Sequence, residues 1–194
     1  QSMYDKGYVL ISLHKIAKME TQPDGTVQMV QQPIYLPRGK KPFVLSEDDV
    51  CYYEYMTGTG FATKLCLDEN GKVVNEYVER DGSVSYGSYD VLTVLEDFIE
   101  THPDFSYQGS KGILAFTGYD GILGYRTSDF WYNENCDYYV STPANDKEKR
   151  EDHTSPNENI EQDKQTAREV AQAIRDLGWE LASHSWGHLN MTST

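Results

Sequence analysis

Cysteine is scarce in this sequence, and no two cysteines lie close together along it. The 194 residues contain three of them, Cys51, Cys66 and Cys136, without any Cys-x-x-Cys spacing. This pattern excludes a thiolate zinc site of the usual spacing and a dense disulfide framework. One disulfide with a free thiol, or three free thiols, are both compatible with it.

Basic residues are also few. The 17 Lys and Arg face 31 Asp and Glu, which gives a formal net charge of −14. Binding to a nucleic acid backbone or to an anionic membrane surface requires clustered positive charge, so both kinds of partner are excluded. The balance fits a secreted protein that acts on a neutral or cationic substrate.

Long apolar runs are absent, and no signal peptide is recognisable, so we expect no membrane insertion. Hydrophobic residues make up 38% of the chain, enough for the core of one domain over residues 1–194. Tyrosine is abundant, with 15 residues. Its amphipathic ring suits carbohydrate sites, and it equally suits the edge of a sheet core.

Hydrophobic patterning predicts short strands that alternate with helices, and therefore an α/β fold with parallel strands. Such sheets bind ligands at the C-terminal ends of their strands. We expect strands over 8–13, 41–46, 112–117 and 179–182, and helices over 90–102 and 163–177.

The region 61–87 has a different pattern. Alternating segments flank Asn70-Gly71 and Asp81-Gly82, which are strong turn dipeptides, so we expect β-hairpins inserted into the larger fold. Residues 18–41 and 141–162 are polar and are expected to be loops, the first with short extended pieces.

Chemically active side chains follow three of the expected strands. Asp48 and Asp49 follow the second strand, Tyr119 and Asp120 follow the third, and His184 and His188 follow the last one. Two histidines four residues apart can bind one metal ion, and Asp49 can supply a third ligand. Metal-bound water is acidic, and Asp48 can act as its general base.

The His-x-x-x-His pair is a weak signal when it stands alone. Ser185 occupies the position where the zincin motif requires Glu. Two histidines and one carboxylate also bind iron in 2-oxoglutarate oxygenases, which leaves a rival class. The parallel strand order and the spacing of the histidines disfavour that class.

The segments that contain these residues resemble the motifs of the polysaccharide deacetylases, the NodB-homology carbohydrate esterases. Their first motif, Thr-Phe-Asp-Asp-Gly at the end of a strand, is similar to 43–50, where both Asp are kept. Their second motif, His-Ser/Thr-x-x-His after a helix and a strand, is similar to 177–188 along its whole length.

The resemblance implies a distorted or incomplete (β/α) barrel and an extracellular or cell-surface location. It implies hydrolysis of the acetyl groups of a peptidoglycan or chitin-like polysaccharide, with Asp48 as catalytic base. Asp49, His184 and His188 would hold a divalent ion, most simply zinc. Residues expected to contact the substrate are Tyr119, Asp120, Tyr125 and Trp186.

The sequence departs from the family in three ways. The two motifs lie further apart than usual, about half of the usual domain is matched, and the family's later Arg-Pro, Trp and His elements are missing. A competing first motif is 117–121, where Asp120 would be the ligand and Tyr119 would replace the base. A second function is therefore open, a catalytically inactive carbohydrate-binding module that uses aromatic residues such as Trp131.

Overall fold

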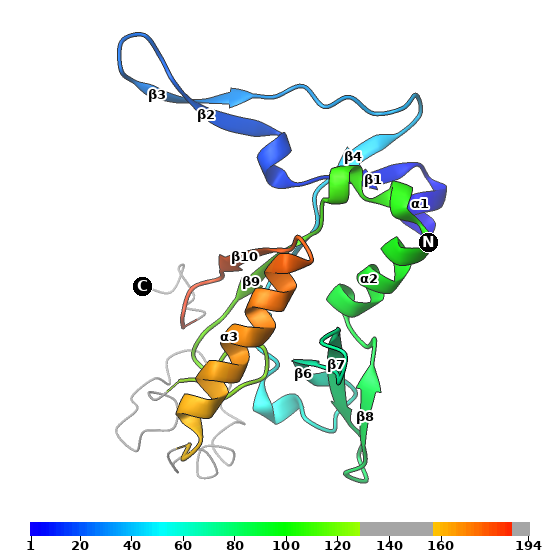
Figure 1. Cartoon of the computed structure of the whole chain (residues 1–194), viewed down its shortest axis with the longest axis vertical. Coiled ribbons are helices and arrows are strands. Elements are labelled where there is room, and N and C mark those ends of the chain that lie inside the picture. Colours follow the sequence, from blue (N-terminus) through cyan, green and yellow to red (C-terminus); the bar gives the residue numbers. More distant parts are fainter. Residues whose placement is uncertain (129–156, 188–194) are drawn as a thin grey trace, which may run out of the picture.

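The computed structural model of the chain describes residues 1–128 and 157–187, which form a mixed α/β fold with four small sheets (Figure 1). One sheet consists of three parallel strands in the order β10–β9–β5, and a second pairs β1 with β4 in parallel. The bounds of these strands are β1 Tyr8–Leu10, β4 Lys41–Phe43, β5 Ser46–Glu47, β9 Ile113–Phe116 and β10 Glu180–Ser183.

The parallel arrangement predicted from the sequence is confirmed. The expected strand over 41–46 is divided into two, because β4 pairs with β1 and β5 then pairs with β9. This one segment therefore connects the two parallel sheets. The barrel closure that the family resemblance implies stays a prediction.

The expected hairpins at 61–87 are present as an antiparallel meander of β6 (Ala62–Leu67), β7 (Val73–Val78) and β8 (Val84–Gly87). Val73 and Leu65 turn toward the interior and are buried. The alternating pattern that predicted these strands therefore reflects one buried face.

A further hairpin, of β2 (Ala17–Thr21) and β3 (Val27–Gln31), lies where a loop with short extended pieces was expected. It projects from the body of the molecule (Figure 1). Met19, Val27 and Met29 are each more than half exposed, so the hairpin has no buried face. Without such a face the sequence lacks the alternation by which strands are recognised.

Two longer helices carry much of the packing, α2 (Val91–Thr101) and α3 (Ile160–Asp176). The prediction for α2 is confirmed; α3 begins three residues earlier than expected, inside the segment expected to be loop. Gly178 follows α3 with a φ of 98°, the left-handed conformation expected at a helix end. Short helices are α1 (Ser2–Asp5), η1 (Leu13–Lys15), η2 (Glu54–Met56), η3 (Pro103–Phe105) and η4 (Tyr107–Gly109).

The core lies between α3, the parallel sheet and the meander. Val170 and Ile174 of α3 pack in one cluster with Leu114 of β9 and Leu65 of β6. Trp179, 3% exposed, joins the cluster and donates from its indole nitrogen to Glu96 Oε1 at 2.7 Å. The meander is therefore packed against the same core as the strands of the parallel sheet.

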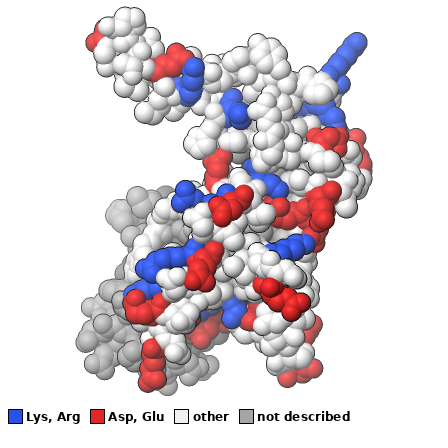
Figure 2. Space-filling view, viewed as in Figure 1, with Lys and Arg blue, Asp and Glu red and all other residues white. Residues whose placement is uncertain are grey.

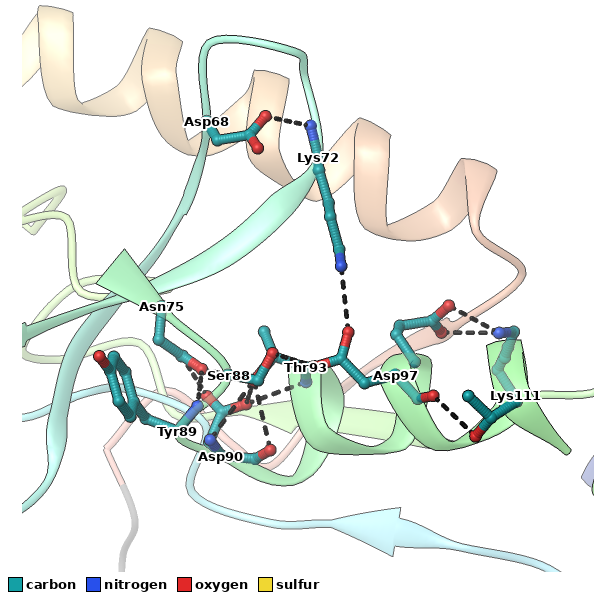
Figure 3. Close-up of polar contacts among 11 residues, drawn as sticks. Asp68, Lys72, Asn75, Ser88, Tyr89, Asp90, Thr93, Asp97 and Lys111 are labelled. Carbon is teal, nitrogen blue, oxygen red and sulfur yellow. Dashed lines mark hydrogen bonds and ion pairs between the residues drawn. The ribbon is translucent and has the colours of Figure 1, made fainter. Parts of the chain in front are cut away.

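A buried polar network joins the meander to the first turn of α2 (Figure 3). Asn75 of β7 is completely buried and donates to Asp90 Oδ2 at 2.6 Å. Its carbonyl oxygen accepts from Thr93 Oγ1 at 2.6 Å and from the backbone N–H of Tyr89 at 3.0 Å. Asp90 in turn caps α2 through the backbone N–H of Thr93, so the Asn75 amide bonds to both side chains that cap the helix.

Asn75→Ala is expected to lower the free energy of unfolding by about 3 kcal/mol, because it leaves buried donors and acceptors without partners. Urea denaturation of the wild type and the variant measures this change. Asn159→Ala is the matched control, since Asn159 is exposed and makes no side-chain capping bond; it should change stability by less than about 0.5 kcal/mol. Equal effects of the two substitutions would contradict the assignment of the network.

Candidate functional site

The C-terminal ends of β5, β9 and β10 bring Asp49, Thr117 and His184 together. His184 Nε2 lies 3.7 Å from Asp49 Oδ1. Thr117, which is fully buried, donates to the same carboxylate oxygen at 2.9 Å. The side chains of His184 and Asp49 remain 35% and 42% exposed. The prediction that residues far apart in the sequence converge at these strand ends is therefore confirmed for this pair.

The backbone sets the positions of both residues. Backbone hydrogen bonds to β9 extend beyond the last residues of β5 and β10. The Val50 N–H donates to the Ala115 carbonyl at 3.2 Å, and the His184 N–H donates to the Phe116 carbonyl at 2.8 Å. Asp49 has a φ of 58° and Ser185 a φ of 65°. Residues other than glycine adopt this conformation rarely, and such residues often occur at functional sites.

Trp186 lies over the end of β9. The Gly118 N–H donates to the Trp186 carbonyl at 3.1 Å. A Cβ atom at Gly118 would lie 2.8 Å from Cδ1 of the indole, so only glycine leaves space for the ring here. Trp186 is 45% exposed and thus presents an aromatic surface next to His184.

Two of the predicted metal ligands are described by the structure, and the third, His188, lies outside the described residues. Within residues 1–128 and 157–187, no three His, Cys, Asp or Glu side chains form a metal-binding group. The predicted base, Asp48, is exposed at the end of β5.

The separation of Asp49 and His184 fits a shared ion. At 3.7 Å the two atoms are too far apart for a hydrogen bond. Ligand atoms on one tetrahedral zinc ion lie about 3.3 Å apart, close to this separation. One imidazole and one carboxylate, both open to solvent, are also a donor set that zinc accepts.

Asp120, the ligand of the competing first motif, is buried instead, at 2% exposure. Its Oδ2 accepts from the backbone N–H of Glu54 at 2.8 Å and lies 3.1 Å from Arg126 Nη1. Arg126 also donates to the Asp120 carbonyl and to the Tyr52 carbonyl, each at 2.6 Å. This placement favours a structural role for Asp120 and favours Asp49 as the ligand.

Tyr119 and Tyr125, both predicted to contact substrate, differ in their surroundings. The Tyr119 ring lies 5.5 Å from the Tyr53 ring, and burial with a hydrogen bond between the two residues raises the pKa of Tyr119. Tyr125 is 9% exposed, belongs to the core cluster and has Lys64 Nζ 5.8 Å from its ring. Trp131, another aromatic candidate, lies outside the described residues.

A pocket of about 370 Å³ opens beside Asp49, and sequence reasoning did not find it. Four of its lining residues belong to no motif that the sequence makes recognisable. Tyr53 and Phe61 lie on the connection from β5 to β6, and Tyr89 and Asp90 directly precede α2. The name side pocket is used below for this cavity, whose lining includes Glu47, Asp49, Tyr53, Phe61, Tyr89 and Asp90.

The Glu47 carboxylate of the side pocket has a perturbed pKa. Burial raises its pKa to about 7, and the nearby negative charge of Asp90 acts in the same direction. Among the described residues, its side chain forms no hydrogen bond or ion pair. A cation in the pocket would favour the ionised form and lower this pKa.

Within the described residues Cys51 and Cys66 form no disulfide; burial raises the pKa of Cys51 to about 12 and also raises that of Cys66. Neither thiol is therefore suited to act as a nucleophile at neutral pH. Cys136 lies outside the described residues.

Comparison of the chain with known protein families, with curated proteins and with solved structures found no match. In the part of the chain that the structure describes, no helix has the length and apolar character needed to cross a membrane.

Asp120→Asn is expected to destabilise the protein by about 3 kcal/mol, because it removes the negative charge of a buried ion pair and leaves the Arg126 charge uncompensated. Asp49→Asn is the matched substitution at an exposed position and should cost less than about 1 kcal/mol. Urea denaturation of the two variants without added metal compares them. A neutral effect of Asp120→Asn would reopen the competing first motif.

Proposed function

We propose that the protein is a metal-dependent deacetylase of an N- or O-acetylated polysaccharide, of the peptidoglycan or chitin type. One observation carries this proposal: Asp49 and His184 approach to 3.7 Å at the ends of two strands that both pair with β9. The resemblance of the surrounding segments to polysaccharide deacetylase motifs supplies the class of reaction.

Asp49 and His184 would hold the ion, and His188 is the third ligand in this proposal. A bound zinc ion would polarise the acetyl carbonyl and acidify a water molecule. Thr117 orients the Asp49 carboxylate by its hydrogen bond, as partners of metal ligands commonly do. Asp48, exposed beside Asp49, would accept the proton of the attacking water.

Three features around Asp49 and His184 support the proposed deacetylase function. Trp186 offers a ring face on which a sugar can stack, next to His184. The side pocket begins at Asp49, so a bound glycan has space on the other side of the pair. The net charge of −14 suits a neutral or cationic substrate.

Incubation with zinc should load about one ion per chain, and His184→Ala should abolish stoichiometric binding, because it removes a ligand. Asp49→Ala should have the same effect. His14→Ala is the control and should retain the ion, since His14 lies on η1 with its side chain 80% exposed. Elemental analysis after gel filtration measures the content, and full zinc content in His184→Ala would refute the ligand assignment.

Asp48→Asn should retain the zinc ion and lose about 100-fold or more of the rate of acetate release, because the general base is removed. The assay follows acetate released from N-acetylglucosamine oligosaccharides and from acetyl esters. Asp104→Asn, exposed on η3, is the control and should keep the wild-type rate.

The second candidate is a carbohydrate-binding module without catalysis, favoured by the exposed aromatic rings of Trp186 and Phe61. Saccharide binding by the zinc-loaded chain without any release of acetate would establish this function in place of the first.

A further inference from the structure

The side pocket is continuous with the proposed metal site, because Asp49 lines it. The pocket lies where the β5–β6 connection and the residues before α2 meet. Its volume of about 370 Å³ is at the small end of the range of small-molecule sites, which suits one sugar ring. A glycan whose acetyl group lies at Asp49 and His184 can therefore place a neighbouring ring here.

Aromatic side chains form the rim of the side pocket. Phe61 is 55% exposed and Tyr89 is 45% exposed, although both are large and apolar. Tyr89 is held in place from three directions. Its N–H donates to Asn75, its hydroxyl donates to Ser85, and its ring lies 5.2 Å from that of Tyr77. Exposed aromatic rings at a pocket suit stacking against the C–H face of a pyranose.

The charged groups of the side pocket are of one sign. Glu47, Asp49 and Asp90 line it, and its lining within the described residues contains no Lys, Arg or His. Asp90 is engaged by Asn75 and Tyr52, whereas the described residues offer the Glu47 side chain no hydrogen bond or ion pair. On the face drawn in Figure 2, acidic and basic side chains are interspersed.

We propose that the side pocket binds one hexosamine ring of a chitin-like glycan and excludes sugars with acidic substituents; this inference rests on the deacetylase function proposed above. Hydroxyl, amide or ammonium groups of the ring donate hydrogen bonds to Glu47, while its apolar face stacks on Phe61. The lactyl carboxylate of a muramic acid unit would meet Glu47 and Asp90 as a like charge. The pocket thus separates chitin-like substrates from peptidoglycan strands.

Titration calorimetry at about pH 9, well above the pKa of about 7 that burial gives Glu47, tests this on the full chain in a chelator, without catalysis. The probes are a tetrasaccharide of β-1,4-linked N-acetylglucosamine, its partly deacetylated form, and a tetrasaccharide that alternates N-acetylglucosamine with N-acetylmuramic acid. We expect the acidic probe to bind at least about tenfold more weakly than the other two. Phe61→Ala should weaken binding of both chitin-type probes about fivefold, the effect of one stacked ring.

Two further variants separate stacking from charge. Glu47→Gln should reduce the discrimination against the acidic probe to about threefold or less, because a charge is removed and the shape is kept. Tyr35→Ala removes an aromatic ring that is 79% exposed and lies outside the side pocket, and should leave every affinity unchanged. Equal affinity of wild-type protein for the acidic and neutral probes, or an unchanged affinity in Phe61→Ala, would overturn the proposal.

The same titrations with His184→Ala distinguish failure of this inference from failure of the proposed function. His184 does not line the side pocket, so this variant should retain the discrimination between the probes. Retained discrimination together with no acetate release by the zinc-loaded wild type would remove the deacetylase function and leave the pocket as a selective glycan site. Loss of discrimination in His184→Ala would contradict the placement of the ring in the side pocket.

Discussion

The backbone pairing of β9 is the constraint on which the candidate site depends. β9 lies between β5 and β10, and the hydrogen bonds on its two sides continue as far as Val50 and His184. Parallel neighbours in register end at the same edge, so residues far apart in the sequence are placed side by side by the sheet itself. The separation of Asp49 and His184 is therefore set mainly by the backbone and does not require an ion to bring the residues together.

The loops beyond the strand ends are held by a second set of contacts. Arg126 donates to the carbonyl groups of Tyr52 and Asp120, which lie on the connections after β5 and β9. The backbone N–H of Arg126 donates to Asp163 of α3 at 3.2 Å, and Asn157 donates to the same carboxylate. The loops are thus tied to a helix as well as to each other. A site supported in this way keeps its geometry before a ligand arrives, which is the condition for efficient binding and catalysis.

Patterning predicted the elements that bury one regular face. The periodicity of 90–102, the turn dipeptides Asn70-Gly71 and Asp81-Gly82, and the apolar run of β9 each reflect a local rule that the tertiary structure keeps. Short extended pieces were expected within 18–41, but the pairing of β2 with β3 escaped prediction because both faces of the hairpin are exposed. The division of 41–47 into β4 and β5 escaped it because the change of partner from β1 to β9 is a property of the sheet and is not encoded in any local pattern.

In the candidate site, too, some features follow from local sequence patterns and others depend on contacts formed only in the folded chain. Asp49 and His184 follow predicted strands, so their convergence could be inferred from strand order alone. Asp120 also follows a predicted strand, but its burial depends on Arg126, and the sequence gives no sign of that pairing. Asn75 and the side pocket required still more distant contacts, because the meander, the β5–β6 connection and the start of α2 meet only in the folded chain.

The electrostatics of the side pocket also bear on function. A half-buried carboxylate without a cationic partner costs stability, and the raised pKa of Glu47 reflects this cost. Two other carboxylates with little exposed area have cationic partners, Asp120 with Arg126 and Glu96 with Lys111. A neutral residue at position 47 would remove the cost without affecting the β5–β9 pairing, which uses only backbone atoms. Glu47 is thus unfavourable for stability and lies beside the candidate ligands Asp49 and His184. Residues that lower stability in this way are expected where a binding site, rather than folding, determines the residue.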